Sequence, residues 1–180
     1  MIKLFEEIPR FGNDDIGIRR LETVDIPYLD EMTSDPQVYR FLPTFLFEKQ
    51  YADTAKMISD LYGEYFSAKE SLILAIEDKR SDSFCGLAEF YGFKDSLHKV
   101  CVGYRLRSEC WGKGIATAAV GLMVDYLFTR TDIEIITAST MIENRASARV
   151  LEKNGFICTA HSVPEDWGYP EPTTADKWFR

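Results

Sequence analysis

The chain has 180 residues, of which 46% are hydrophobic and 28% charged, a composition typical of a folded globular protein. Its formal net charge of −8 disfavours a nucleic-acid partner, because phosphate binding requires a basic face, and is compatible with an amine-bearing substrate. No apolar run reaches the ~18 residues that a membrane helix needs, and Met1–Arg10 lacks the apolar segment of a signal peptide. We expect one domain spanning residues 1–180.

The four cysteines are Cys85, Cys101, Cys110 and Cys158, and no two of them form a C-x-x-C pair. This spacing disfavours a zinc site, so we expect no metal and predict reduced, mostly buried thiols in a cytoplasmic protein. Cys110 lies close to a glycine-rich loop and is a candidate nucleophile. No histidine is near it in the sequence, which favours a packing role instead.

Hydrophobic spacing predicts alternating strands and helices in the first part of the chain. Two short helices are expected to start at Thr23 or Asp25 and at the turn Ser34-Asp35-Pro36. The other predicted segments are a strand at Ile16–Leu21, an aromatic loop at Phe41–Phe47, a helix at Lys49–Ala68, and strands at Ser71–Glu77, Phe84–Phe93 and Lys99–Leu106.

The second part of the chain continues the alternation, which indicates an α/β fold. A helix at Ala146–Lys153 is expected to end at Gly155, which can adopt the left-handed conformation of a C-cap. The other predicted segments are a helix at Ala118–Phe128, strands at Glu134–Thr140, Phe156–Ala160 and Thr174–Phe179, and a loop rich in proline and acidic residues at His161–Thr173.

The most informative motif is Trp111-Gly112-Lys113-Gly114-Ile115-Ala116-Thr117, which joins a predicted strand to a predicted helix. Glycines let the backbone approach a ligand closely, and the helix directs its free N–H groups at the same point. This combination predicts an anion site, and a pyrophosphate is the expected anion. The motif lacks the Gly-Lys-Ser/Thr ending of a P-loop and the third glycine of a dinucleotide fingerprint.

With this loop, the chain resembles the GNAT superfamily of N-acetyltransferases, and within it the RimJ/RimL-like branch. The resemblance runs from about Ile18 to Ala160. The segments that carry it are Leu21-x-x-x-Asp25, Ser34-Asp35-Pro36-Gln37-Val38, Val102-Gly103-Tyr104-Arg105-Leu106, the glycine loop, and Asn144-Arg145-Ala146-Ser147 followed by Lys153-Asn154-Gly155-Phe156.

The resemblance implies a mixed α+β fold, with a mostly antiparallel sheet of about seven strands flanked by helices. It implies acetyl-CoA as cosubstrate, bound between a splayed pair of strands. Backbone groups of Tyr104 and Leu106 would pair with the pantetheine arm, and Asn144 would hydrogen-bond a pantetheine amide. The pyrophosphate would be held by backbone N–H groups of Gly112, Lys113, Gly114, Ile115, Ala116 and Thr117.

The resemblance also implies direct transfer of the acetyl group to a primary amine, with no covalent enzyme intermediate. Many members of the superfamily use a tyrosine to protonate the leaving thiolate, but the matching position here is Leu151. In the RimL-like branch the serine of Asn-x-x-Ser is thought to supply that proton, which points to Ser147. Candidate bases for the amine are Glu89, Glu165 and Asp166.

Simpler interpretations remain open for several of these residues. Asn144 can serve only as a helix cap and Ser147 only as a first-turn hydroxyl. Lys113, Arg149 and Lys153 can be solvated charges rather than phosphate ligands. The aromatic residues that can wall an acceptor site, or simply pack, are Tyr39, Phe41–Phe47, Trp167 and Tyr169.

Three functions are consistent with the sequence. The leading one is an acetyl-CoA-dependent N-acetyltransferase that acts on a protein N-terminus or on a small amine, as a monomer or homodimer. The second is a catalytically silent CoA-binding sensor or interaction module, suggested by Leu151. The third is a different nucleotide-binding module.

Overall fold

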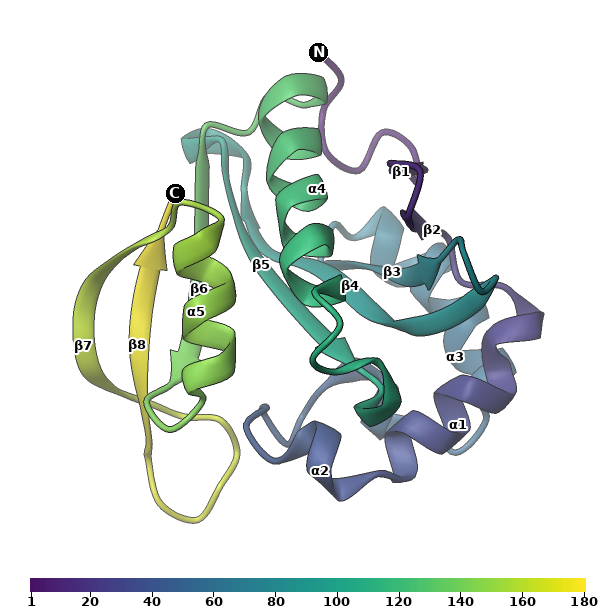
Figure 1. Ribbon diagram of the computed structural model, residues 1–180. Coiled ribbons are helices and arrows are strands. Elements are labelled where there is room, and N and C mark those ends of the chain that lie inside the picture. Colours follow the sequence, from purple (N-terminus) through teal and green to yellow (C-terminus); the bar gives the residue numbers. More distant parts are fainter.

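The computed structural model describes all residues from 1 to 180 and consists of one eight-stranded sheet with helices on both faces (Figure 1). The strand order is β1-β2-β3-β4-β5-β6-β8-β7. The strands are β1 (Phe11–Gly12), β2 (Ile16–Arg19), β3 (Ser71–Asp78), β4 (Ser83–Lys94), β5 (Lys99–Leu106), β6 (Ile135–Met141), β7 (Ile157–Glu165) and β8 (Thr173–Phe179). The mixed, mostly antiparallel sheet that the resemblance implied is confirmed, and the very short β1 raises the expected strand number from about seven to eight.

One pair of neighbouring strands is parallel. β5 and β6 pair from Lys99–Ile135 to Cys101–Thr137 and no further, whereas every other neighbouring pair is antiparallel. The connection between them contains the long helix α4 (Ile115–Arg130), since parallel neighbours need a crossover. Figure 1 shows α4 lying across the sheet and beginning near the point where β5 ends.

The two faces of the sheet carry separate hydrophobic clusters. α4 packs on one face together with α5 (Arg145–Lys153), and the other face is covered by α1 (Ile26–Ser34), α2 (Pro36–Tyr39) and α3 (Thr54–Asp60). β3 serves both clusters, because its residues alternate between them: Leu72 and Leu74 face α4, and Ile73 and Ala75 face α1 and α3. This two-sided burial explains the continuous apolar run of β3.

The predicted helix over Lys49–Ala68 is wrong in its boundaries. Phe47–Gln50 forms a 3-10 turn, and α3 begins only at Thr54, where the Asp53 carboxylate accepts a hydrogen bond from the Lys56 N–H. A π-helical turn at Leu61–Tyr65 follows, and the helical segment ends at Ser67. The apolar spacing was correct for α3, but it could not reveal that Asp53 caps a new helix start.

The predicted loop at His161–Thr173 is also partly wrong. β7 continues to Glu165, paired with β8 through two shifts of register, and the loop covers only the residues after it. Its proline and acidic residues hid the strand, since β-bulges tolerate them at a sheet edge. Other expectations agree: α5 ends before Gly155, whose φ is 75°, and Pro36 begins α2.

No helix of the chain combines the length and the apolar character needed to cross a membrane.

Candidate functional site

A cavity opens where β5 and β6 separate. Its volume is about 1030 Å³, and it lies between Val102–Leu106 of β5 and Ala138–Thr140 of β6, beyond the last pair of the parallel ladder. The first turns of α4 and α5 form part of its wall, together with segments within 37–50 and 165–167 and residues between 65 and 91. The splay of the two strands therefore opens a cavity inside the sheet.

The glycine loop lies at this opening. Gly112 and Gly114 have φ values of 71° and 78°, and a Cβ added to either would meet no atom within 4 Å. Backbone N–H groups from Gly112 to Thr117 donate to no acceptor within the protein, and no side chain caps α4. Unpaired amides at a helix N-terminus attract anions, so this wall of the cavity is suited to a phosphate group.

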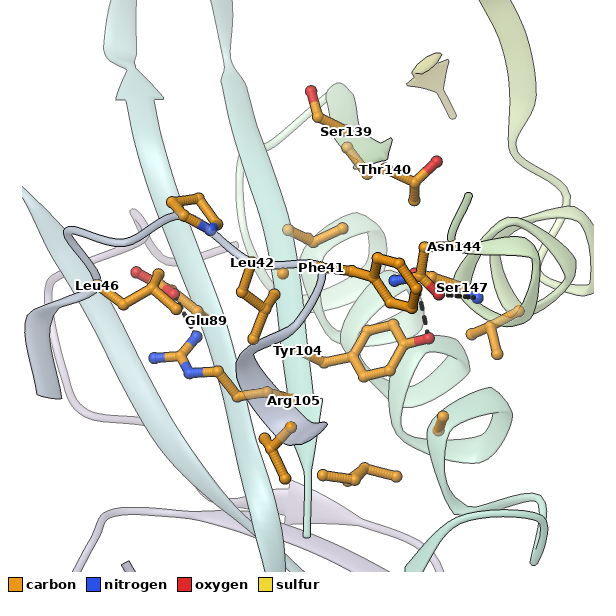
Figure 2. Close-up of a pocket in the computed structure, with 18 of the residues that line it drawn as sticks. Phe41, Leu42, Leu46, Glu89, Tyr104, Arg105, Ser139, Thr140, Asn144 and Ser147 are labelled. Atoms are coloured by element: carbon orange, nitrogen blue, oxygen red, sulfur yellow. Dashed lines mark hydrogen bonds and ion pairs between the residues drawn. The ribbon is translucent and has the colours of Figure 1, made fainter. Parts of the chain in front are cut away.

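The side chains of Tyr104, Asn144 and Ser147 converge where β5 faces the first turn of α5, as Figure 2 shows. The Tyr104 hydroxyl donates to Ser147 Oγ over 3.3 Å, and the Asn144 Oδ1 atom accepts from the Ser147 backbone N–H at 3.2 Å. Asn144 is thus the N-cap of α5, as the simpler interpretation held, while its Nδ2 donates to no protein group. Burial raises the pKa of Tyr104, so its hydroxyl keeps its proton at neutral pH.

A buried charged cluster occupies the opposite wall. Arg105 binds Glu48 through Nε and Nη2 at 2.5 and 2.6 Å, and its Nη1 binds Glu89 at 2.6 Å. Burial by itself lowers the pKa of Arg105, but the two carboxylates outweigh it and hold the pKa above its ordinary value. The Tyr39 hydroxyl donates to Glu48, and Ser71 donates to the second oxygen of Glu89. Glu89, a candidate base from the sequence, is only 9% exposed, and both of its carboxylate oxygens are engaged.

The end of β7 brings further carboxylates to the cavity. Glu165 pairs with Lys177, and Asp166 accepts from the backbone N–H of Gly168 through one oxygen, at 2.8 Å. Asp166 is exposed, and its other oxygen has no protein partner. The adjacent Trp167 is buried and lines the cavity.

The structure collects nearly all of the residues singled out from the sequence around one cavity. Among the candidate phosphate ligands, Lys113 and Arg149 are exposed and lie outside the cavity wall. Of the predicted aromatic wall, Tyr39 and Tyr169 lie outside the lining. The predicted residues that line the cavity are Glu89, Tyr104, Leu106, Gly112, Gly114, Ile115, Ala116, Thr117, Asn144, Ser147, Lys153, Glu165 and Asp166, together with Phe41, Phe45, Phe47 and Trp167.

Two details bear on the individual expectations. Backbone groups of Leu106 were expected to pair with a ligand, but its carbonyl already accepts a hydrogen bond from the Trp111 indole N–H at 2.9 Å. Burial, reinforced by the neighbouring Cys85, raises the pKa of Cys110 to about 12, so this thiol stays protonated at neutral pH. Cys110 packs in the core, as its sequence context favoured.

Sequence reasoning missed Glu48 and the Arg105 side chain. Arg105 interrupts an apolar strand pattern, which was the one available signal that it is buried with partners. Nothing local marked Glu48, since its partner lies 57 residues away in the chain.

A mixed sheet that splays around a helix N-terminus with free amides is the architecture of an N-acetyltransferase, and comparisons with known proteins agree. The chain belongs to the GNAT acetyltransferase family, whose domain model, "Acetyltransferase (GNAT) domain", matches residues 15–157. An uncharacterised N-acetyltransferase, p20, from Bacillus licheniformis is 30% identical over 143 residues, which are 78% of each chain. The chain is accordingly an N-acetyltransferase.

Two solved structures share the fold. Spermidine N-acetyltransferase from Vibrio cholerae, in complex with CoA and spermine, aligns with a TM-score of 0.76 at 20% identity. The alignment covers 93% of this chain and 96% of the Vibrio cholerae chain. RimL, a ribosomal L7/L12 alpha-N-protein acetyltransferase in complex with CoA, aligns with a TM-score of 0.78 at 15% identity and covers 96% of each chain. The second structure is consistent with the RimJ/RimL-like branch.

Replacing Arg105 with methionine should lower the free energy of unfolding at pH 7 by about 3–5 kcal/mol, because Glu48 and Glu89 would stay buried without a counter-charge. The deficit should shrink in acid, because a neutral carboxyl needs no counter-charge. Urea unfolding at several pH values measures both effects.

The control is Arg10→Met, because that arginine side chain is 74% exposed and lies 3.9 Å from Glu77. This variant should lose less than about 1 kcal/mol. Equal stability of the two variants would contradict a stabilising role for Arg105.

Proposed function

We propose that the chain transfers the acetyl group of acetyl-CoA directly to a primary amine, either a protein N-terminus or a small amine. The observation that carries this proposal is the row of unpaired amides from Gly112 to Thr117 beside the cavity between β5 and β6. Six consecutive donors without a protein acceptor fit a pyrophosphate, and the adjoining cleft fits an extended arm.

The cleft offers further groups for the acetyl-CoA arm. Beyond Cys101, the edge of β5 that faces β6 has no strand partner, so its backbone groups are available to a ligand that adds like a strand. We assign this edge at Tyr104 and Leu106, with the free Nδ2 of Asn144, to the pantetheine arm. The Leu106 carbonyl would contribute through its second lone pair, because Trp111 uses the first.

The Gly114→Val variant should lose acetyl-CoA affinity by at least about 100-fold in calorimetry. A β-branched residue is strained at a φ of 78°, and its side chain would extend from the loop into the space that we assign to the pyrophosphate. Gly63→Val is the control, because a Cβ at Gly63 also meets open space but lies outside the cavity. Wild-type affinity in a folded Gly114→Val protein would remove this loop from the binding site.

The acceptor side of the cavity favours a cationic amine. Glu70, Glu165 and Asp166 line it, and the charge of Arg105 is already balanced by Glu48 and Glu89. Relatives support the amine class: curated spermidine N(1)-acetyltransferases from Vibrio cholerae and Escherichia coli are 22% and 25% identical to this chain. A panel containing spermidine and peptides with free N-termini would identify the acceptor class. Acetyl-CoA binding without turnover of any amine would support the silent sensor instead.

Attack on the thioester requires a neutral amine, and we assign Asp166 as the group that takes its proton. Glu89 is a poorer base because Arg105 and Ser71 hold both of its oxygens. Glu165 is paired with Lys177. Asp166 alone among the three is exposed, with an oxygen free of protein partners.

Asp166→Asn should lower kcat/KM at pH 7 by about 100-fold and leave acetyl-CoA affinity unchanged. The deficit should diminish as the pH rises towards the pKa of the acceptor, because more of the amine is then neutral without a base. Glu171→Gln, in the same loop but outside the cavity, is the control. A larger, pH-dependent loss in Glu165→Gln or Glu89→Gln than in Asp166→Asn would move the base to that residue.

The departing CoA thiolate needs a proton. We assign Ser147 as its donor, and Tyr104 as the group that supplies a proton to Ser147 in turn. Ser147 Oγ accepts from the Tyr104 hydroxyl, so its own hydrogen is free to point into the cleft. As Ser147 gives its proton to the sulfur, it takes one from Tyr104, and water in the open cleft then returns a proton to the Tyr104 oxygen. This pair of hydroxyls supplies the donor that Leu151, buried in the core, cannot provide.

Ser147→Ala should lower kcat by 10²-fold or more, in the usual range for a lost general acid. Tyr104→Phe should lower kcat by about 10-fold with little change in the KM for acetyl-CoA, and the double variant should equal Ser147→Ala, because both hydroxyls serve one proton path. Steady-state kinetics with Tyr126→Phe, a buried tyrosine outside the cavity, as control tests this. Additive losses would show that Tyr104 acts independently of Ser147.

A further inference from the structure

We propose that Cys158, His161 and Asp176 form a Zn²⁺ site on the surface of the β7–β8 pair, outside the acetyl-transfer cavity. The sequence suggested no metal, since no two cysteines form a C-x-x-C pair. The structure instead brings together a Cys-x-x-His pair on β7 and an aspartate on β8. The proposal does not depend on the function proposed above.

The three donor atoms already have nearly the separation that a metal requires. Cys158 Sγ lies 3.3 Å from His161 Nδ1, and His161 Nδ1 lies 3.4 Å from Asp176 Oδ1. All three donor atoms are within 4.8 Å of one another. Tetrahedral zinc with bonds of about 2.0–2.3 Å separates its ligand atoms by roughly 3.3–3.7 Å, so only a small closure of the triangle is needed.

Irregular pairing produces this convergence. In a regular strand, residues three apart point to opposite faces, so Cys158 and His161 should not meet. The register between β7 and β8 shifts between Cys158 and Ala160 and again between Ala160 and Val163. Each extra residue turns the strand, and the two shifts bring the thiol and the imidazole to the same side.

A neighbouring backbone group orients the aspartate. The Ser162 N–H donates to Asp176 Oδ1 at 3.0 Å, and Ser162 has a φ of 52°, a conformation that is unusual for a residue with a side chain. Such support for a ligating carboxylate is the usual companion of a metal site. The Cys158 thiol is partly buried and the His161 side chain 74% exposed, so an ion can reach the site from solvent.

The donor set selects the metal. Thiolate and imidazole are preferred by zinc, whereas magnesium and calcium require oxygen donors. Three protein ligands leave the fourth position to water. Bound zinc would hold β7 against β8 at the bulge, four residues before Glu165 at the end of the strand.

The test is a metal titration of the full chain after treatment with a chelator. Zn²⁺ in calorimetry should bind with a stoichiometry of one and micromolar or tighter affinity, more tightly at higher pH because the thiol must lose its proton. Co²⁺ should give the charge-transfer absorption of a cobalt–thiolate bond. Cys158→Ser should abolish that absorption, and His161→Asn and Asp176→Asn should each weaken Zn²⁺ binding by at least about 10-fold.

The matched control is His98→Asn, which removes the only other histidine of the chain. His98 Nδ1 also lies beside a carboxylate, 3.5 Å from Asp132, but without a cysteine. Full Zn²⁺ affinity in His98→Asn and loss in His161→Asn would support the site. The absence of a cobalt–thiolate band, or equal Zn²⁺ binding by the wild type and Cys158→Ser, would show that the cluster is only a thiol–imidazole hydrogen bond and overturn the proposal.

Discussion

The ladder between β5 and β6 joins only Lys99–Cys101 to Ile135–Thr137, and the architecture of the site depends on its early end. Parallel neighbours require a crossover, which here passes through α4 and places the N-terminus of that helix beside the end of β5. A longer ladder would pair the edge of β5 and close the cavity. A shorter ladder would detach β6, β8, β7 and α5 from the rest of the sheet.

The splay leaves backbone groups of β5 and of the glycine loop without protein partners, which a buried segment rarely tolerates. An open cleft lets water or a ligand satisfy them. The same geometry thus explains why the fold has a cavity here and why a strand-like ligand with an anionic end is the best match to it. Binding would complete hydrogen bonding that folding left incomplete.

One buried cluster of charges is arranged around Arg105. Its contacts with Glu48 and Glu89 connect the 3-10 turn at Phe47–Gln50 to β4 and β5. Most of the segment that precedes this turn, from Leu42 to Leu46, lacks regular structure and lines the cavity. A bidentate ion pair therefore gives this irregular wall a defined position on a rigid sheet.

Local sequence signals predicted the elements whose cause is local. The glycine loop, α5 with Asn144 and Gly155 at its ends, and the apolar β3 all follow from spacing and capping chemistry. Residues brought together by long-range pairing were missed: Glu48 beside Arg105, Tyr104 beside Ser147, and the continuation of β7 to Glu165. The family resemblance supplied Ser147 as a candidate acid, but only the fold shows that the Tyr104 hydroxyl donates a hydrogen bond to it.

The two outer strands of the sheet have a consequence for how the molecule can associate. β1 has only two residues, and β7 at the opposite edge is bulged and contains Pro164, which has no N–H to donate. Short, irregular or proline-containing edges are poor templates for another strand. Two copies of the chain are therefore poorly suited to joining their sheets edge to edge into one continuous sheet, and self-association would have to use side chains on helices and loops. The same edges protect the apolar sheet from fibril-like stacking while the protein folds.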